Sequence, residues 1–581
     1  MKKIITLLLL SSTSIILSAQ VLTSARITDW SKAGLDTIIP YPTNQVDITT
    51  YGGVGDGTTL NNTAIASAIA ALGGNPGIVY FPQGTFNFSS SINLPNGVIL
   101  KGASTADSHL TFDLGGNGDC ILMHGTTTQA IDSLAIDATK DSFTLTLTHG
   151  TAVNVGDYIR IIFDDNALLF SSWAYFSIGQ ICKITAKAGN VITLNSPLRM
   201  DFTTALHARI AKLTPRKNVG IECLSIQRLD ASVGQTTTID INNAVNCWLK
   251  NVEVSFCNFA HVAISNSSNI LIEGSFFHEA FAYGGNGQGY GVAIQYASGE
   301  CLIQNNIFRI QRHAMLIQAG ANGNVCAYNY CREQQRTEFP SNAAGDMVLH
   351  GNQPFANLFE SNSGNNITID YSHGDNGPWN TYFRNRAALY GIIMSTPYSP
   401  NQNIVGNEIT STSFGTGNYI VGGTGLFDFG NNKNGAILPS GTTPLNDISY
   451  FFTTPPSYLQ GATLPIIGIQ NTINTGIIPA EQRWVSGNYV SCAPPLNVGI
   501  TNSINETELN IFPNPTYGIL TILNNSNDYL KVFNSLGQLV FEKQLTKENS
   551  IVDLSQLNNG VYTLFLKNKE NDSEHLKVIK Q

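Results

Sequence analysis

HGNQPFANLFESN, from His350 to Asn362, aligns without a gap with HGDNGPWNTYFRN, from His373 to Asn385. Both segments begin with His-Gly followed by Asn or Asp, and both carry Asn at the eighth and thirteenth positions. The offset is 23 residues, about the length of one coil of a parallel β-solenoid. The alignment predicts that His350 and His373 lie one above the other on neighbouring coils.

Similar intervals extend from residue 218 to about residue 410. Short apolar segments align on turn positions that are 22 to 33 residues apart. These positions are Cys223, Asn251, Gly274, Asn305, Asn329, Asn362, Asn385 and Asn407. Asn at a tight turn can bond backbone groups and adopt left-handed geometry, so we expect these residues to stack. The two longest intervals predict loops at 279–291 and 332–346.

The composition supports an all-β chain. Only 12% of the 581 residues are charged, whereas ordinary globular domains carry about 25% charged residues. Gly accounts for 53 residues. Few charges, many Gly and short β-branched runs are typical of a fold with many turns. The net charge of −9 argues against a nucleic-acid partner, which needs a basic face.

Residues 1–19 read as a signal peptide. Lys2 and Lys3 precede an apolar stretch, and Leu17-Ser18-Ala19 offers a cleavage site. No later run approaches the roughly 18 apolar residues of a membrane span. We therefore expect an exported protein without a transmembrane segment.

Four of the nine cysteines are spaced near multiples of one coil: Cys223, Cys247, Cys301 and Cys326. We expect them to be stacked interior thiols rather than a disulfide scaffold. A Cys326–Cys331 bridge is the alternative.

Residues 20–138 predict an N-terminal cap and the first coils. Thr63–Leu72 reads as a short helix, and 77–82 and 98–100 read as strands between Gly and Pro turns. A helix at this place would cover the open apolar end of a solenoid.

The same stretch resembles the N-terminal segment of the pectate-lyase-like superfamily of right-handed β-helices. The resemblance is carried by Tyr51-Gly52, Gly55-Asp56-Gly57, Val79-Tyr80-Phe81-Pro82-x-Gly84-Thr85-Phe86 and Leu94-Pro95-x-Gly97-Val98. It implies the fold, a right-handed parallel β-helix. It does not imply one activity, because that superfamily includes lyases, glycosidases, epimerases and phage tailspikes.

Three further segments follow from pattern changes. Residues 139–215 alternate apolar and polar residues as antiparallel strands do, which predicts an inserted β module. That module could overhang a groove or decorate one face. Residues 216–492 carry the main coils, and 493–507 read as a linker.

Residues 508–581 predict a small C-terminal β-sandwich. They resemble the C-terminal sorting domain of the type IX secretion system of Bacteroidetes, through Phe512-Pro513-Asn514-Pro515 with Gly518, Ser535-Leu536-Gly537 and Leu557-x-x-Gly560-Val561-Tyr562. The resemblance implies the type IX secretion machinery as a partner, and a secreted or cell-surface location.

Arg and His are concentrated between residues 278 and 386, a segment without Lys. Strand alternation predicts one outward column there, Gln295–Gln318–His350–His373, with Asp346 and Asp375 close by. A second column contains His278, Arg309 and Glu333. Two such columns with the aromatic residues Tyr290, Tyr371 and Trp379 would suit an extended sugar chain, because aromatic rings stack on sugar faces.

A lyase acting on a uronate must neutralise the carboxylate, abstract the C5 proton and protonate the leaving oxygen. His350 or His373 could be the base, Arg384 or Arg312 the carboxylate clamp, and Tyr371 the acid. Ca²⁺ is the alternative clamp. A glycosidase would instead need two carboxylates, and the candidates are Asp346, Asp370, Asp375, Glu333 and Glu279. The alternative is a purely structural role, in which the stacked His-Gly turns only form hydrogen bonds with neighbouring backbone carbonyls.

The Asp-rich calcium cluster of classical pectate lyases and the paired-Asp motif of polygalacturonases are not found in the sequence, nor is the Asp-Pro-His-Asp signature of alginate epimerases. We therefore predict a secreted monomer that degrades an extended, acidic polysaccharide, with a lyase favoured over a glycoside hydrolase. A non-catalytic glycan-binding or adhesin β-helix is the competing class.

Overall fold

The computed structural model describes residues 20–36, 39, 41–459, 461–492, 510–512, 516–525, 529–534, 538–545, 548–567 and 573–580. The chain divides into two compact units between residues 494 and 495. The predicted signal peptide (1–19) and linker (493–507) lie outside the described residues.

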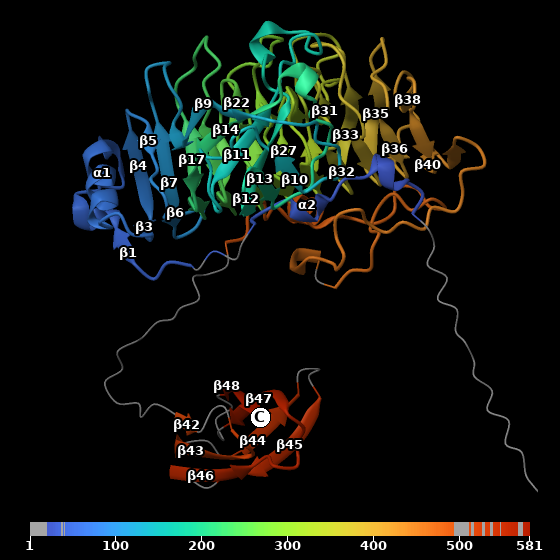
Figure 1. Cartoon of the computed structure of the whole chain (residues 1–581). Coiled ribbons are helices and arrows are strands. Elements are labelled where there is room, and N and C mark those ends of the chain that lie inside the picture. Colours follow the sequence, from blue (N-terminus) through green and yellow to red (C-terminus); the bar gives the residue numbers. More distant parts are fainter. Residues whose placement is uncertain are drawn as a thin grey trace, which may run out of the picture. The chain divides into compact units, whose positions relative to one another are not determined.

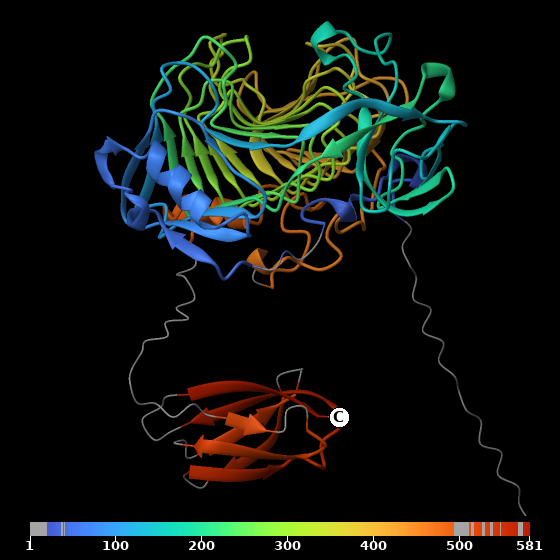
Figure 2. The ribbon, with the colours of Figure 1, turned by 60° about the vertical axis from the view of Figure 1, so that its left-hand side comes forward.

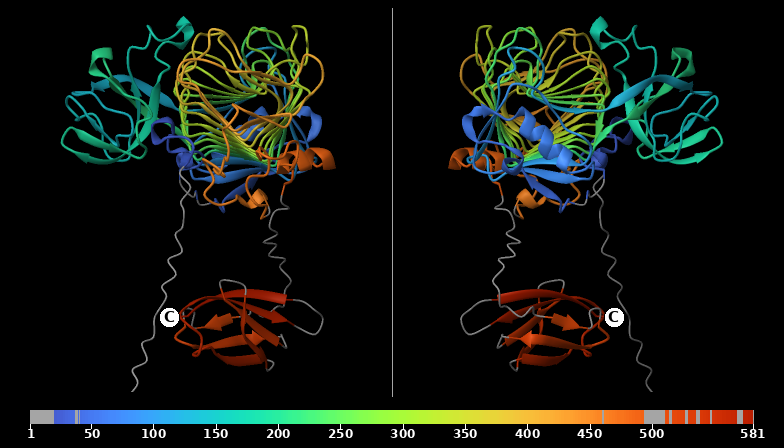
Figure 3. Two further views of the ribbon diagram at one scale, coloured as in Figure 1. Left: turned by 90° about the vertical axis from the view of Figure 1, so that its right-hand side faces the viewer. Right: turned by 90° about the vertical axis from the view of Figure 1, so that its left-hand side faces the viewer.

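The first unit is a right-handed parallel β-helix, as predicted. Its strands form three faces, and the coils superimpose when the molecule is viewed along the solenoid axis (Figures 1 and 3). The first face contains β1 (Gln45–Asp47), β3 (Gly77–Phe81), β6 (Val98–Gly102), β16 (Gly220–Glu222), β20 (Trp248–Lys250), β23 (Leu271–Glu273), β26 (Leu302–Gln304), β29 (Val325–Ala327), β32 (Leu358–Glu360), β34 (Thr381–Phe383), β36 (Asn403–Val405) and β39 (Phe427–Phe429).

The other two faces share the long strands β33 (Ser363–Ile369) and β35 (Arg386–Met394). The second face also contains β2 (Asp56–Leu60), β4 (Gly84–Phe88), β7 (Ser108–Phe112), β17 (Ser225–Arg228), β21 (Glu253–Ser255), β24 (Phe276–His278), β27 (Ile307–Arg309), β30 (Tyr330–Arg332), β37 (Glu408–Ile409), β40 (Asn431–Lys433) and, antiparallel, β41 (Ala436–Leu438). The third face contains β5 (Ile92–Asn93), β8 (Ile121–His124), β18 (Ile239–Asn242), β22 (Ala260–Ser265), β25 (Tyr290–Gln295), β28 (His313–Ile317), β31 (Met347–Leu349) and β38 (Asn418–Ile420). A short pair, β15 (Arg216–Lys217) and β19 (Ala244–Val245), completes the coils.

The predicted capping helix is confirmed as α1, Asn62–Ala71. Its buried residues Ala64, Ile65 and Ala68 belong to the same apolar cluster as the core of the coils. The apolar end of the solenoid is thereby covered (Figure 2).

Two straps run along the coils. The N-terminal strap, residues 20–36 and 41–44, includes the 3₁₀ helices η1 (Ser24–Arg26) and η2 (Trp30–Lys32). It donates hydrogen bonds from Arg26 to Asn403 and from the indole of Trp30 to the Ala356 carbonyl. The C-terminal strap, residues 439–459 and 461–492, includes η6 (Ser457–Leu459) and α2 (Pro479–Ser486). The remaining 3₁₀ helices are η3 (Ile48–Tyr51), η4 (Ser172–Ala174) and η5 (Thr204–Leu206).

Asn side chains stack inside the turns, but one residue away from part of the predicted alignment. Asn306 pairs with Asn329, and the ladder continues through Asn362, Asn385, Asn407 and Asn431. The predicted members Cys223, Asn251, Gly274 and Asn305 occupy the preceding column, where φ is positive. Asn is favoured in both columns. In the preceding column it tolerates left-handed geometry, and in the ladder its side chain forms hydrogen bonds, so the amino-acid sequence alone could not distinguish the two columns.

Replacing Asn362 by Ala should lower the free energy of unfolding by about 2–4 kcal/mol, because buried backbone groups lose their partners. The Asn362 amide donates to the Cys326 carbonyl and to Asn385, and its oxygen accepts from Asn329. Denaturant unfolding of the variant checks this. Asn117→Ala, at an exposed turn, serves as control and should differ from the parent by less than about 0.5 kcal/mol.

The inserted module is an antiparallel sheet of six strands in the order β10-β13-β12-β11-β14-β9, and it projects to one side of the coils (Figure 3). Its strands are β9 (Thr126–Ser133), β10 (Thr144–Thr146), β11 (Tyr158–Ile162), β12 (Gly179–Ala188), β13 (Val191–Leu194) and β14 (Arg209–Thr214). The module thus starts at Thr126, in a segment that the sequence analysis assigned to the first coils. Arg199 anchors it by an ion pair with Glu300, and both side chains are 2% exposed.

The cysteine prediction is partly wrong. Cys247, Cys301 and Cys326 are buried free thiols, as expected, and Cys331 is also free. Cys223 instead forms a disulfide with Cys492, across 269 residues of sequence. The disulfide fixes the end of the C-terminal strap to an early coil.

The second unit is a small β-sandwich. One sheet contains β42 (Asn510–Phe512), β43 (Ile519–Asn525) and β46 (Glu548–Asp553). The other contains β45 (Leu539–Gln544), β44 (Tyr529–Phe533), β47 (Gly560–Lys567) and β48 (Ser573–Lys580). Leu520, Ile522, Leu530, Val532 and Leu564 lie in the core between them.

Candidate active site

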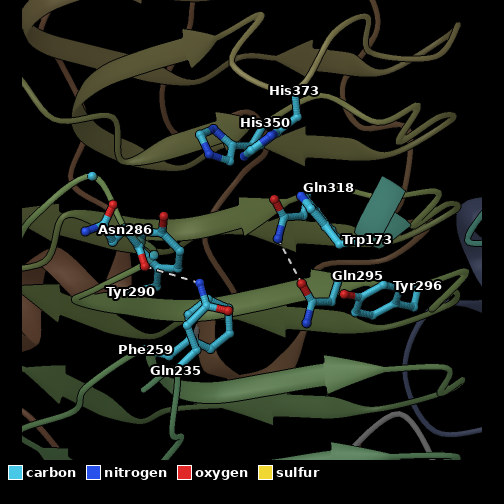
Figure 4. Close-up of a pocket in the computed structure, with 12 residues that line it drawn as sticks. Trp173, Gln235, Phe259, Asn286, Tyr290, Gln295, Tyr296, Gln318, His350 and His373 are labelled. Carbon is cyan, nitrogen blue, oxygen red and sulfur yellow. Dashed lines mark hydrogen bonds between the residues drawn. The ribbon is translucent and has the colours of Figure 1, made fainter. Parts of the chain in front are cut away.

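A groove of about 490 Å³ lies over the third face. Figure 4 shows Tyr290 and Phe259 on one side of it, Trp173 and Tyr296 on the other, and His350 and His373 together at one end. The lining residues are Trp173, Gln235, Phe259, Gly285, Asn286, Gly287, Tyr290, Gln295, Tyr296, Gln318, His350 and His373. None of these lining residues carries a carboxylate.

The predicted polar column is present for three of its four members. Ile294, Ile317 and Leu349 are register partners on β25, β28 and β31, so the residues that follow them stack: Gln295, Gln318 and His350. The Gln318 amide donates to the Gln295 side-chain oxygen at 2.8 Å, and Gln295 donates to Ser265 at 3.3 Å. Gln295, Gln318 and His350 would therefore present a row of hydrogen-bonding groups to a ligand along the groove.

The fourth member of the column is Asp370, not His373. Leu349 pairs with Ile369, so His350 is in register with Asp370. The chain then makes a short excursion before the 23-residue match resumes, with Leu358 paired to Thr381. His373 lies on that excursion, and its ring contacts the His350 ring edge-to-face, with 5.0 Å between the centroids.

His350 and Asp370 form a hydrogen-bonded pair. His350 Nδ1 lies 2.5 Å from Asp370 Oδ2. Burial opposes ionisation of Asp370, but its hydrogen bond with His350 holds the pKa of Asp370 below the ordinary value. An ionised carboxylate only accepts, so Nδ1 carries the proton and Nε2 is the nitrogen that can accept one.

The inserted module overhangs the groove, which settles the alternative that the sequence left open. Ser171 Oγ shares a hydrogen bond with His373 Nδ1 at 3.0 Å, and the Trp173 ring meets the His373 ring edge-to-face at 5.3 Å. Trp173 also contacts Tyr296, which lies on the same side of the groove. Burial, and then the nearby His350, lower the pKa of His373, so its ring is neutral at neutral pH.

A stack of rings reaches His350 from the opposite side. Phe259 contacts Tyr290, Tyr290 contacts His313, and His313 contacts His350, with centroid distances of 5.4, 5.1 and 5.6 Å. Burial lowers the pKa of His313 to about 3 and raises that of Tyr290 to about 12. At neutral pH both therefore remain uncharged, and the Tyr290 hydroxyl keeps its proton.

Arg312 lies at the rim of the groove, next to Gly285. Its guanidinium donates to both carboxylate oxygens of Glu338, at 2.8 and 3.1 Å, and to the Tyr283 carbonyl. Those bonds lower the pKa of Glu338 to about 2. Arg312 is thus the one predicted cation that the described part of the chain places beside the groove, and it is already paired.

The second predicted column lies on a different face. His278 and Arg309 are register partners on β24 and β27, but the next residue in that register is Arg332 rather than Glu333. His278 bonds Glu253 and Glu279, and Arg309 bonds Glu279 and Glu333. These pairs do not line the groove, so the predicted border of two columns is wrong.

Five other candidates lie outside the groove lining. Arg384 is 3% exposed and donates to the carbonyls of Leu445, Asp447 and Gly468 in the C-terminal strap. Trp379 packs under the Lys140 ammonium. Asp346, Asp375 and Tyr371 also line no part of it. No signal in the sequence indicates these roles, because they depend on contacts with the C-terminal strap and the inserted module.

Asp346 is structural. It is 1% exposed and accepts from the backbone N–H groups of Asn365 and Asn366. Burial outweighs these bonds and raises the pKa of Asp346 to about 6.

Asp346 should make stability fall as pH rises. Below pH 3.8, its ordinary pKa, folded and unfolded chains both hold this proton. Between that value and about 6 only the folded chain holds it, so stability is lost across this window, by about 3 kcal/mol. In denaturant unfolding at pH 4.5 and pH 7, Asp346→Asn should show a smaller decline than the parent. Equal declines would contradict the prediction, and Asp36→Asn, at an exposed position, is the control.

Sequence reasoning missed several groove residues. Trp173 comes from the module, and Gln235, Asn286 and Tyr296 come from loops. Asp370 was among the candidate carboxylates for a glycosidase, but its position beside His350 was not predicted. The others required knowledge of which loops meet. In the described part of the chain, no cluster of three or more His, Cys, Asp or Glu side chains is arranged to hold a metal ion; Ca²⁺ stays a prediction.

Comparisons with known proteins agree with both resemblances. Residues 45–151 match the family described as rhamnogalacturonase A/epimerase, pectate lyase-like. Residues 510–581 match the secretion system C-terminal sorting domain. This domain indicates export by type IX secretion, to the cell surface or the extracellular space. Among the described helices, none is long and apolar enough to span a membrane.

Longer matches are distant. The pre-neck appendage protein of Bacillus phage phi29 is 25% identical over 416 residues, which are 68% of this chain and 42% of the phage protein. The chain thus spans less than half of that relative. The tailspike gp49 of Pseudomonas phage LKA1 is 16% identical with a TM-score of 0.49, covering 63% of this chain and 64% of its own. The mannuronan C-5 epimerase AlgE6 A-module of Azotobacter vinelandii is 12% identical with a TM-score of 0.32, covering 66% and 98%.

Proposed function

We propose that this chain is a secreted enzyme that cleaves an extended acidic polysaccharide by β-elimination. The proposal starts from its similarity to pectate-lyase-like right-handed β-helix proteins and from its C-terminal sorting domain. The observation that carries the proposal is the His350–Asp370 pair at the end of an aromatic and amide-lined groove. A carboxylate that holds Nδ1–H prepares Nε2 to take a proton.

The proposed reaction begins when His350 Nε2 removes the C5 proton of a uronate. The electron pair forms the C4–C5 double bond, the C4–O4 bond breaks, and the departing oxygen takes a proton. Tyr290 is the proposed donor of that proton, in place of Tyr371, because Tyr290 lines the groove and Tyr371 does not. The amides of Gln295 and Gln318, with Arg312 at the rim, are the groups proposed to bind the uronate carboxylate.

Glycoside hydrolysis is less favoured by this groove. It would need two carboxyl groups about 5–9.5 Å apart on either side of the scissile bond, whereas the groove lining described above has none and Asp370 is bound to His350. Glycan binding without turnover is the second candidate. The neutral Gln295–Gln318 column and the ring stack favour it, since both suit sugar hydroxyls and sugar faces.

The test is an activity panel with the full-length protein on polygalacturonate, rhamnogalacturonan and alginate. β-elimination generates an unsaturated uronate that absorbs in the near ultraviolet, and we expect that signal on at least one polymer. New reducing ends without the absorbance would replace the lyase by a hydrolase. Retention on a polymer with neither signal would support the binding protein.

A further inference from the structure

The segment between β11 and β12 carries an unusual set of exposed side chains. Residues 166–178 contain no charged residue. Within them Phe170 is 68% exposed, Trp173 43% and Tyr175 39%. An exposed patch of large apolar side chains commonly marks an interaction site on a protein surface. We call Phe170, Trp173 and Tyr175 the aromatic platform.

The platform is fixed to the two turns that follow His350 and His373. The side-chain oxygen of Asn352 accepts from the backbone N–H groups of Phe170 and Ser171, at 3.1 Å each. Gly374 leaves room for this approach, since a Cβ there would lie 2.7 Å from Cβ of Phe170. The segment is therefore positioned by the same turns that form one end of the groove.

The platform is continuous with the groove. Trp173 belongs to both, since it lines the groove beside His373 and remains partly exposed. A polymer that lies along Gln295, Gln318 and His350 would meet this segment as it leaves the groove at the His373 end. Phe176 is not part of the platform, because its ring lies 5.5 Å from the Arg209 guanidinium within the module.

We propose that the aromatic platform is a second glycan-binding surface, which holds the same polysaccharide chain beyond the catalytic end of the groove. The polymer class rests on the proposed function. Uncharged aromatic rings bind the apolar faces of sugar rings, and they would do so without contacting uronate carboxylates. The inserted module thereby makes the protein selective for long chains over short ones.

The experiment compares full-length Phe170→Ala, Tyr175→Ala and the double variant with the parent. Retention in affinity gels containing polygalacturonate, rhamnogalacturonan or alginate should weaken about 2- to 10-fold for each substitution, the range of a single aromatic contact. Affinity for trisaccharides of the same polymers should stay within twofold. Phe143→Ala is the matched control, because Phe143 is 47% exposed on the same module and lines no part of the groove.

Unchanged retention of the double variant overturns the proposal, and so does failure of the parent to be retained by any of the three polymers. An equal loss of trisaccharide affinity also overturns it, since the platform would then be part of the groove. The proposed function is judged separately by the ultraviolet signal. A parent that is retained through the platform but makes no unsaturated ends would sink the lyase and leave the platform standing.

Discussion

His350→Ala should lower turnover about 10²- to 10⁴-fold, the usual contribution of a positioned acid or base, while thermal unfolding stays within a few degrees of the parent. The ring lines the groove, and its hydrogen bond goes to Asp370 rather than to the core. Asp370→Asn should also lower kcat, because an amide can donate to Nδ1 and so stabilise the wrong tautomer. The measurement is initial rate by near-ultraviolet absorbance on the polymer that gives the largest signal.

His124→Ala is the matched control for this prediction. His124 Nε2 lies 2.6 Å from Asp240 on β18, so it is a second His–Asp pair on the same face of the coils, outside the groove lining. Its replacement should leave the rate unchanged. A rate for His350→Ala within threefold of the parent, or equal losses in both variants, would remove His350 from the mechanism.

Arg199→Ala should lower the free energy of unfolding by about 3–5 kcal/mol, because it leaves Glu300 charged and unpaired in the interior. Arg199 also donates to Asn322 at 2.9 Å, so it joins the module to two coils at once. Denaturant unfolding of the full-length protein gives the measurement. Weakened anchoring should also reduce polymer retention, since the module carries Trp173.

Arg209→Ala provides the comparison for Arg199. Arg209 pairs with Asp164, which is 44% exposed, on the same module. Exposed pairs contribute about 0–1 kcal/mol, so this variant should remain close to the parent. If both substitutions cost the same, the buried ion pair does not hold the module. A double replacement of Arg199 and Glu300 by Met should cost less than Arg199→Ala alone, because no unpaired charge remains.

Much of the fold could be predicted because it follows from local patterns. The 23-residue match of His350–Asn362 with His373–Asn385 predicts the coil, and the coil is present with Leu358 paired to Thr381. The capping helix was predicted to within one residue at each end. Strand alternation placed Gln295, Gln318 and His350 on one outward face, since side chains change sides at every residue of a strand.

Register within a turn was beyond the same reasoning. Asn305 and Asn306 are both turn residues, and only the pairing of β26 with β29 shows that Asn306 belongs to the ladder. In the same way, the excursion between Asp370 and His373 keeps the length of the coil while changing which side chain faces His350. A one-residue difference in a turn leaves no trace in composition or spacing.

Local patterns were enough to predict the solenoid, its cap and three members of the polar column, because each depends on neighbours within one coil or one repeat. The export domain was predicted from a family resemblance. The groups that meet the column depend on tertiary contacts. Arg384 serves the C-terminal strap, Cys223 bonds Cys492 across the coils, and Trp173 reaches the groove from the inserted module. These contacts join residues far apart in the chain, and their partners are set by how long segments fold back over the coils rather than by any local period.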